Sequence, residues 1–253
     1  MSDTFWTAVS AIGGVAAFAA ITWQAVLTRS TLRVTQDTAL EAVRARLDSA
    51  APMVTVQIAA PPWPPLAWAP SGKPVQPWPE GHLFEFPEKK GLRIVLQQAV
   101  TIANSSASRV EVRVTGDLVE TDDETHRLRR PELLLLEAGQ SAELHLMGNF
   151  TVGELAENYQ ARQSDQQLPH RVTASVSVHD GRDNGTTDIW ELQLTGCPVQ
   201  PHSSRDSVWI VVPYHITEGE GLRSLDYSLL PPRRRIHWIS RAADRRLPEP
   251  PLR

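Results

Sequence analysis

One stretch of the chain has the acidic side chains and glycines of a calcium-binding loop. Counted from Asp180, the fifth and sixth positions of an EF-hand loop would be Asn184 and Gly185, and the twelfth would be Glu191. The third position is Arg182, a cation where calcium needs an oxygen ligand. The flanking segments alternate like strands, and Asn-Gly favours a tight hairpin turn. We therefore predict a hairpin here and no metal site.

The sequence carries none of the familiar catalytic or cofactor motifs. It has no Walker A loop, GxGxxG, GxSxG, HExxH or CxxC. The lone cysteine, Cys197, precedes Pro198 and has no local signature of a nucleophile, so we interpret it as a buried or idle thiol. The eight histidines are scattered, without a pair at metal-ligand spacing. We predict no catalytic residues, no metal and no cofactor.

The residues best suited to binding lie in a proline-rich segment, residues 61–79. It contains eight prolines, which fix φ and remove amide donors, so it cannot be a central strand. Two interpretations stay open: a packed surface connection, or a recognition segment or aromatic lid. We predict packing, and keep its tryptophans as candidate interaction residues: Trp63, Trp68 and Trp78.

A second candidate surface is the basic tail, residues 217–253. Its last part, residues 231–253, holds seven arginines against two acidic residues. Basic and aromatic side chains near a membrane favour contact with anionic lipid headgroups. A net charge of −4 gives no global reason to expect nucleic acid, and a solvated, partly docked tail is the alternative. The candidate contact residues are Arg233, Arg234, Arg235 and Trp238.

An apolar segment without charged residues begins at Thr4 and ends at Thr28. A helix of this length is about 37 Å long, enough to cross a hydrocarbon core of about 30 Å. The start, Met1-Ser2-Asp3, lacks the basic residues of a signal peptide. A core helix would show a polar stripe, and this segment is apolar nearly all round. We predict a transmembrane anchor over residues 1–28, with the lipid bilayer as its partner.

The flanks of this segment predict its direction. No Lys or Arg precedes it, whereas Arg29, Arg33, Arg44 and Arg46 follow it. The positive-inside rule then places the C-terminal domain in the cytoplasm of a single-pass cell-membrane protein. Small residues spaced by four, such as Ser10 and Gly14, are typical of self-associating helices, so a homodimer is one interpretation and chance is the other.

The next segment, residues 29–50, predicts a juxtamembrane helix. Its apolar stripe steps by three or four residues along one face: Leu32, Gln36, Leu40, Val43 and Leu47. We predict that this face packs on the following domain, with a dimeric stalk as the alternative.

From Met53 onward the periodicity becomes that of strands. Val54, Val56 and Ile58 alternate with polar residues, and similar patterns predict strands over residues 93–103, 109–119, 142–147, 171–179, 187–195 and 207–213. Residues 104–108 form a turn that would make two of these strands neighbours. Polar turns between about seven strands predict an Ig-like antiparallel β-sandwich over residues 51–216.

One helix interrupts these strands. Thr151 and Glu154 have the spacing of a capping box, and Leu155 and Tyr159 fall on one face, so we predict a helix to about Gln163.

This layout resembles uncharacterised bacterial single-pass membrane proteins with an N-terminal anchor, a juxtamembrane helix and a β-sandwich. Besides the anchor, the resemblance rests on Val100-Thr101-Ile102-Ala103-Asn104, which ends a strand at a turn, and on Ala138-Gly139-Gln140 before the strand at 142–147. It implies no activity.

We therefore expect a membrane-tethered binding or scaffolding module of unknown specificity, facing the cytoplasm, with an unknown protein partner. An extracytoplasmic ligand-binding or envelope protein of inverted topology is the alternative. An enzyme with a dispersed site is the third hypothesis.

Overall fold

The computed structural model describes residues 2–69, 74–121, 128–212 and 224–248, and for residues 2–17 and 19 it describes the backbone alone. The chain divides into two compact units. The first comprises residues 1–50 and 247–253, and the second comprises residues 51–246. Each unit is described by itself.

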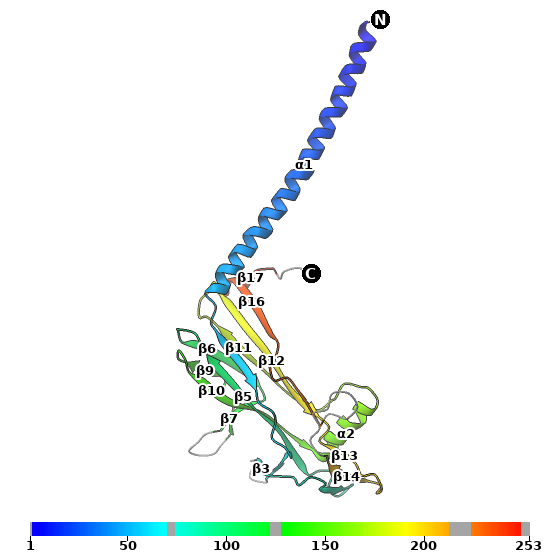
Figure 1. The fold of residues 1–253 in the computed structure, drawn as a ribbon, viewed down its shortest axis with the longest axis vertical. Coiled ribbons are helices and arrows are strands. Elements are labelled where there is room, and N and C mark those ends of the chain that lie inside the picture. The colour runs from blue at the N-terminus through cyan, green and yellow to red at the C-terminus, as the bar shows by residue number, and fades with distance from the viewer. Residues whose placement is uncertain (1, 70–73, 122–127, 213–223, 249–253) are drawn as a thin grey trace. The chain divides into compact units, whose positions relative to one another are not determined.

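The first unit consists mainly of one helix, α1 (Ser2–Ser49) (Figure 1). The predicted anchor and juxtamembrane helix are therefore a single uninterrupted helix of 48 residues. Among the residues that are described in full, no helix combines the length and the apolar character that crossing a membrane requires. Most of the predicted span lies outside those residues, because its side chains up to residue 17 are not described.

The two ends of the predicted juxtamembrane stripe differ in exposure. Leu32 is 56% exposed, whereas Leu47 is 5% exposed. Arg44 is buried and donates to the Glu41 carboxylate and to the carbonyl oxygen of Pro248, both within the first unit. Packing of this helix end on the following domain stays a prediction.

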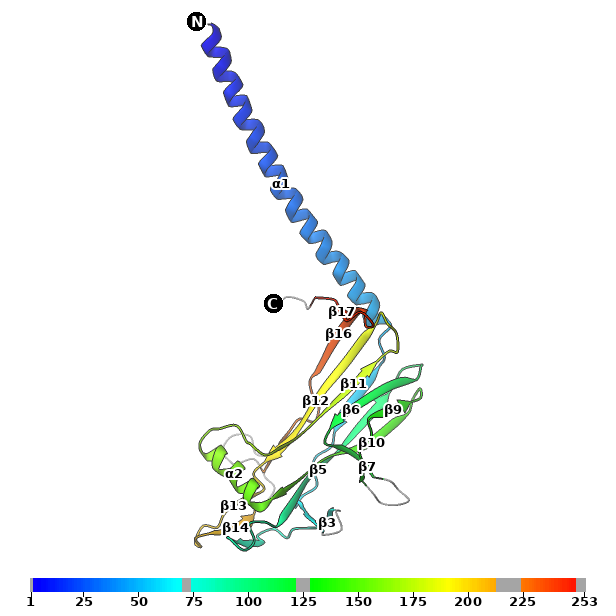
Figure 2. The same ribbon diagram turned by 180° about the vertical axis from the view of Figure 1, so that it is seen from behind.

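The second unit is mainly β, with two antiparallel seven-stranded sheets, an arrangement consistent with the predicted β-sandwich (Figures 1 and 2). Sheet 1 has the order β3-β2-β5-β10-β7-β8, with β1 also paired to β5. Its strands are β1 (Val54–Ile58), β2 (Leu66–Trp68), β3 (Pro74–Pro77), β5 (Arg93–Asn104), β7 (Leu118–Thr121), β8 (Leu128–Arg129) and β10 (Ser141–Thr151).

Sheet 2 has the order β17-β16-β12-β11-β6-β9, with β15 also paired to β12. Its strands are β6 (Val110–Gly116), β9 (Leu133–Leu136), β11 (Arg171–His179), β12 (Thr186–Gly196), β15 (Leu225–Tyr227), β16 (Arg233–Ser240) and β17 (Arg245–Arg246). The predicted hairpin is confirmed, because β11 and β12 pair in register from Arg171↔Thr195 to His179↔Thr187.

Alternation along the strands builds the core. In β1, Val54, Val56 and Ile58 are buried while the residues between them are exposed, as the sequence pattern predicted. The buried residues of the two sheets form one apolar cluster, which includes Val100, Leu144, Val176 and Leu192. Burial of this surface is the main stabilising term for the unit.

Helix α2 (Val152–Gln163) begins directly where β10 ends. Its capping box is confirmed: the Thr151 hydroxyl accepts from the Glu154 N–H at 3.1 Å, and the Glu154 carboxylate accepts from the Thr151 N–H at 2.6 Å. The helix lies beside a small third sheet of β4 (Leu83–Glu85), β13 (Val199–Pro201) and β14 (Val208–Val211) (Figures 1 and 2).

The turn at residues 104–108 differs from the prediction, because it joins strands of different sheets. β5 belongs to sheet 1 and β6 to sheet 2, so they are not neighbours within a sheet. The buried Asn104 side chain fixes this corner by donating to the carbonyl oxygens of Ser108, Leu136 and Glu137 at 2.9–3.1 Å.

The strand predicted over residues 109–119 is also divided between the sheets. β6 ends at Gly116 and β7 begins at Leu118, so the chain crosses from sheet 2 to sheet 1 at this point. Gly116 has φ +88°, and an added Cβ would lie 2.8 Å from the Ala174 Cα. Glycine is therefore needed both for the backbone conformation and for the close approach to β11.

Candidate functional site

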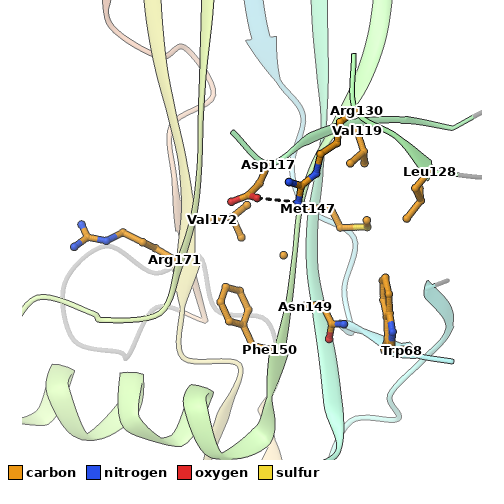
Figure 3. Close-up of a pocket in the computed structure, with 11 residues that line it drawn as sticks. Trp68, Asp117, Val119, Leu128, Arg130, Met147, Asn149, Phe150, Arg171 and Val172 are labelled. Carbon is orange, nitrogen blue, oxygen red and sulfur yellow. Dashed lines mark hydrogen bonds and ion pairs between the residues drawn. The ribbon is translucent and has the colours of Figure 1, made fainter. Parts of the chain in front are cut away.

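A cavity of about 430 Å³ lies beside this crossing, and Figure 3 shows the side chains around it. We call it the edge slot. It takes side chains from both sheets and from the crossing between them. Its lining residues are Trp68, Asp117, Val119, Leu128, Arg130, Met147, Gly148, Asn149, Phe150, Arg171 and Val172.

One wall of the edge slot is a stretch of β10 without a strand neighbour. In the described part of the chain, β7 is the partner on this side of β10, and its register ends at Leu146↔Leu118. One further bond, from the Met147 N–H to the Asp117 carbonyl at 3.1 Å, closes the pairing. β10 continues to Thr151 along β5, so its last residues are paired on one side only.

The alternation of an antiparallel ladder shows which main-chain groups face the slot. The Val152 N–H donates to the Leu92 carbonyl, which places the even-numbered residues of this stretch toward β5. The odd-numbered residues Met147 and Asn149 face the opposite side. The N–H and C=O of Asn149 therefore point toward the cavity at the position where β7 has already ended.

β11 forms the facing wall in the same manner. Its pairing with β6 ends at Ala174↔Gly116, and the Asp117 N–H donates to the Thr173 carbonyl at 3.0 Å. β11 itself begins three residues before Ala174, at Arg171. Because the chain leaves sheet 2 at Gly116, it uncovers the edges of β11 and β10 at the same point.

The side chains divide between the two sides of β10. Asn149 and Trp68 lie on one side of the cavity, and Phe150 and Val172 lie on the other (Figure 3). A Cβ at Gly148 would collide with the Val172 side chain and lie 2.9 Å from the Phe150 ring, so glycine lets the two sheets approach closely here. The floor of the slot is therefore apolar.

Two polar features complete the slot. The Arg130 guanidinium meets the Asp117 carboxylate at 3.3 Å, with the Arg130 side chain 71% exposed (Figure 3). The Oδ1 atom of Asn149 is buried and has no hydrogen-bond partner among the described residues. A buried acceptor without a donor costs free energy, and a bound donor would relieve that cost.

The predicted tryptophans do not form one surface. Trp63 and Trp78 are partly buried and pack against the core. The Trp78 Nε1–H donates to the Arg93 carbonyl at 3.3 Å, and its ring meets Phe84 edge-on at 5.1 Å. Trp68 ends β2 and lines the edge slot.

The proline-rich segment is thus built into sheet 1 rather than lying over it. The prediction that the segment cannot be a central strand is wrong for β2, which contains no proline and pairs with both β3 and β5. Its strand β3 forms the outer edge, where prolines are tolerated.

The region predicted as a basic tail differs from that prediction over its described residues. Residues 233–240 form β16, which pairs with β12 from Trp190↔Arg233 to Thr186↔His237. The buried Asp188 of β12 receives two bonds of 2.6 Å from Arg235 and lies 3.7 Å from Arg233. Residues 217–223 and 249–253 of the predicted tail lie outside the described part.

Trp238 is part of the same strand and is 9% exposed. Its Nε1–H donates to the Thr187 hydroxyl at 2.9 Å, and the Arg246 guanidinium of β17 lies 4.7 Å from its ring centre. Arg234, which alternates with the paired arginines, is exposed. Three of the four predicted contact residues are therefore engaged within sheet 2.

In the loop whose sequence resembles a calcium site, the Asp180 carboxylate is occupied by main-chain N–H groups of the same loop. The Asp180 carboxylate accepts from the N–H groups of Arg182 at 3.1 Å and Thr186 at 3.3 Å. Its neighbour His179 is largely buried, and that burial, with the nearby Arg241, lowers the pKa of the imidazole. In the described ranges, no group of three or more His, Cys, Asp or Glu side chains could hold a metal ion.

Cys197 is buried, as the sequence interpretation predicted. Burial raises the pKa of its thiol to about 11. A thiol of this kind is protonated near neutral pH and is a poor nucleophile.

No protein-family model matches the sequence, and no curated protein matches it. Among solved structures, the chain is similar to a mutant β-glucosidase from Listeria innocua in complex with laminaribiose, at 15% identity and a TM-score of 0.18. The match covers 56% of this chain and 16% of the β-glucosidase chain. A likeness this weak carries no argument about fold or function.

Proposed function

We propose that this chain is a membrane-tethered binding module whose domain faces the cytoplasm. In this proposal residues 4–28 cross the membrane, an Ig-like sandwich carries the binding site, and the edge slot is that site. Within the proline-rich segment, Trp68 is the candidate contact residue, because it lines this site. Contact between the exposed Arg234 and anionic headgroups remains a secondary part of it.

The exposed apolar surface of α1 is the observation that supports the proposed membrane anchor. Phe18, Ile21, Trp23, Val26 and Leu27 are 48–73% exposed. They do not lie on one face, because successive residues on a helix are about 100° apart. An apolar surface of this kind needs lipid or a partner helix to cover it.

The edge slot supports the proposed binding role. Uncovered strand edges are sites where another chain can pair, and folded proteins usually cover them. Here the uncovered edges lie beside a cavity that also exposes an aromatic ring and charged groups. These are the features of a recognition site.

The tether is tested by a matched pair of variants in the full chain. Ile21→Arg lies inside the proposed span, where a charge costs about 2.5–3.5 kcal/mol at the centre of a membrane helix. Val34→Arg also replaces an exposed apolar residue of α1, 65% exposed, but lies beyond the span. We expect Ile21→Arg to shift the protein out of the carbonate-washed membrane fraction and Val34→Arg to leave it there.

Equal behaviour of both variants, or membrane retention after residues 1–28 are deleted, would refute the proposed span. A reporter fused after Arg253 tests the direction. A cytoplasm-active reporter should give signal, and activity of an outside-only reporter would establish the inverted topology instead.

A further inference from the structure

We propose that the edge slot binds an extended peptide segment with apolar residues at alternate positions, which joins sheet 1 as an added strand on β10. This inference rests on the proposed role as a binding module, because it names the ligand of that same site. The occupant takes the line that β7 leaves free beside Asn149. Strand addition of this kind draws its affinity from main-chain hydrogen bonds and its specificity from alternate side chains.

The main-chain geometry favours a strand over other ligands. Asn149 presents an N–H donor and a C=O acceptor side by side, which is the pattern that one residue of an antiparallel neighbour satisfies. The pairing of β7 already shows this side of β10 accepting a strand up to Met147. An added segment would continue that ladder in the same direction.

The buried Oδ1 of Asn149 points to the same occupant. It has no donor among the described residues, and Asn149 lines the cavity. A peptide supplies donors at every residue, through its main chain and through hydroxyl or amide side chains. A hydrocarbon ligand would leave this acceptor unpaired, as it is in the free protein.

The two sides of β10 specify alternating side chains. An added strand would direct one set of side chains toward Phe150 and Val172, which suits an apolar residue. The next residue would face Trp68 and the solvent side. This alternation is the ordinary pattern of a half-buried strand.

Charge gives the slot no preference for an acidic or a basic segment. The charged groups that face the cavity are Arg130 and Asp117 (Figure 3). Asp117 engages Arg130 at 3.3 Å, so these two charges compensate each other. The Arg171 side chain points away from the cavity, because it lies on the opposite face of β11 from Val172 (Figure 3).

The test selects heptapeptides from a random phage-displayed library against the purified full chain in mild detergent, and then measures binding of the synthesised peptides. We expect apolar residues at alternate positions in the selected set. Asn149→Pro should weaken their binding about tenfold, because it removes one main-chain hydrogen-bond donor. A tenfold change in affinity corresponds to about 1.4 kcal/mol. Proline is tolerated where the missing N–H faces an open edge.

Two further variants distinguish the contributions. Asn149→Ala keeps the main-chain N–H and loses the buried Oδ1, so it should retain more affinity than Asn149→Pro. Arg171→Glu changes a side chain that points away from the cavity and should leave peptide binding unchanged (Figure 3). Phe18→Ala, in the first unit, is the control and should leave peptide binding unchanged.

Hydrogen exchange in the wild-type chain keeps the test independent of how Asn149→Pro folds. Saturating peptide should slow exchange of the Asn149 amide and leave the Gly148 amide, which faces β5, unchanged. Peptides that bind Asn149→Pro as tightly, or that leave Asn149 exchange unaltered, overturn strand addition while a binding module remains. If no selected peptide binds more weakly to Trp68→Ala than to the wild-type chain, the edge slot is not the binding site either.

Discussion

The edge slot and strand β16 contain similar side chains, but they differ in whether their hydrogen-bonding groups have partners. Both contain tryptophan and arginine beside an aspartate. In β16, Arg235 and Arg233 converge on the buried Asp188, and the Trp238 ring and indole N–H are both engaged. In the edge slot, main-chain groups of β10 lack a strand neighbour and Asn149 Oδ1 lacks a donor among the described residues. The two regions therefore differ in hydrogen-bond satisfaction rather than in residue type, and this difference is the reason we propose the edge slot as the binding surface.

The largest expected effect is the loss of stability on removing Asp188, the partner of the arginines in β16. Asp188→Ala should lower the free energy of unfolding by about 3–5 kcal/mol, because it leaves the partly buried Arg235 without its carboxylate. Urea denaturation followed by tryptophan fluorescence measures the change. Arg109→Ala removes an exposed pair with Glu137 at 3.9 Å and should cost less than about 1 kcal/mol. Equal costs for the two variants would show that Asp188 is not a structural centre.

A pair of tryptophan variants sharpens the comparison within the proline-rich segment. Trp78→Ala should cost roughly 1.5–3 kcal/mol, because the ring packs on Phe84 and the core. Trp68→Ala should cost less stability but should weaken ligand binding at the edge slot. Thermal unfolding and peptide binding measured on both variants check the division. A larger loss of stability from Trp68→Ala would assign that residue to the core instead.

The smallest effect concerns the capping box at the end of β10. Thr151→Ala should lower stability by about 1 kcal/mol, because the Glu154 N–H loses its acceptor. The exposed helix residue Gln160 offers a control, since Gln160→Ala leaves the cap intact.

The same box gives a pH dependence with a defined sign. The hydrogen bond from the Thr151 N–H lowers the pKa of the Glu154 carboxyl from its ordinary 4.5. A lowered carboxyl pKa stabilises the fold above the unfolded-state value and loses that contribution as pH falls through the folded-state value. The stability difference between wild type and Glu154→Gln should therefore narrow below pH 4.5. A difference that stays constant from pH 7 to pH 3 would contradict this assignment.

Local patterns predicted those parts of the fold that local interactions determine. The alternation in β1 and β11, the hairpin before β12 and the capping box of α2 depend on residues close in sequence, and all are present. β16 was missed because Arg233, Arg234 and Arg235 hide the alternation of a strand, and the burial of Asp188 that pairs with them is a long-range event.

The edge slot was not predictable from periodicity alone. It arises from where β7 and β6 end relative to β10 and β11, which depends on register between distant segments. One local signal was present: Gly116 followed by Asp117, because glycine inside a predicted strand marks a break or a close approach. Within the described part of the chain, Trp68 is the one predicted contact residue that lines the slot.

Hydrogen exchange of the unliganded chain tests the open edge most directly. The amides of Gly148 and Phe150 face β5 and should be protected together with the core of sheet 1. The Asn149 amide between them should exchange at the rate of a solvent-exposed group. Protection of Asn149 equal to that of its two neighbours would mean that this edge is already covered, and would contradict both the open edge slot and the strand addition proposed for it.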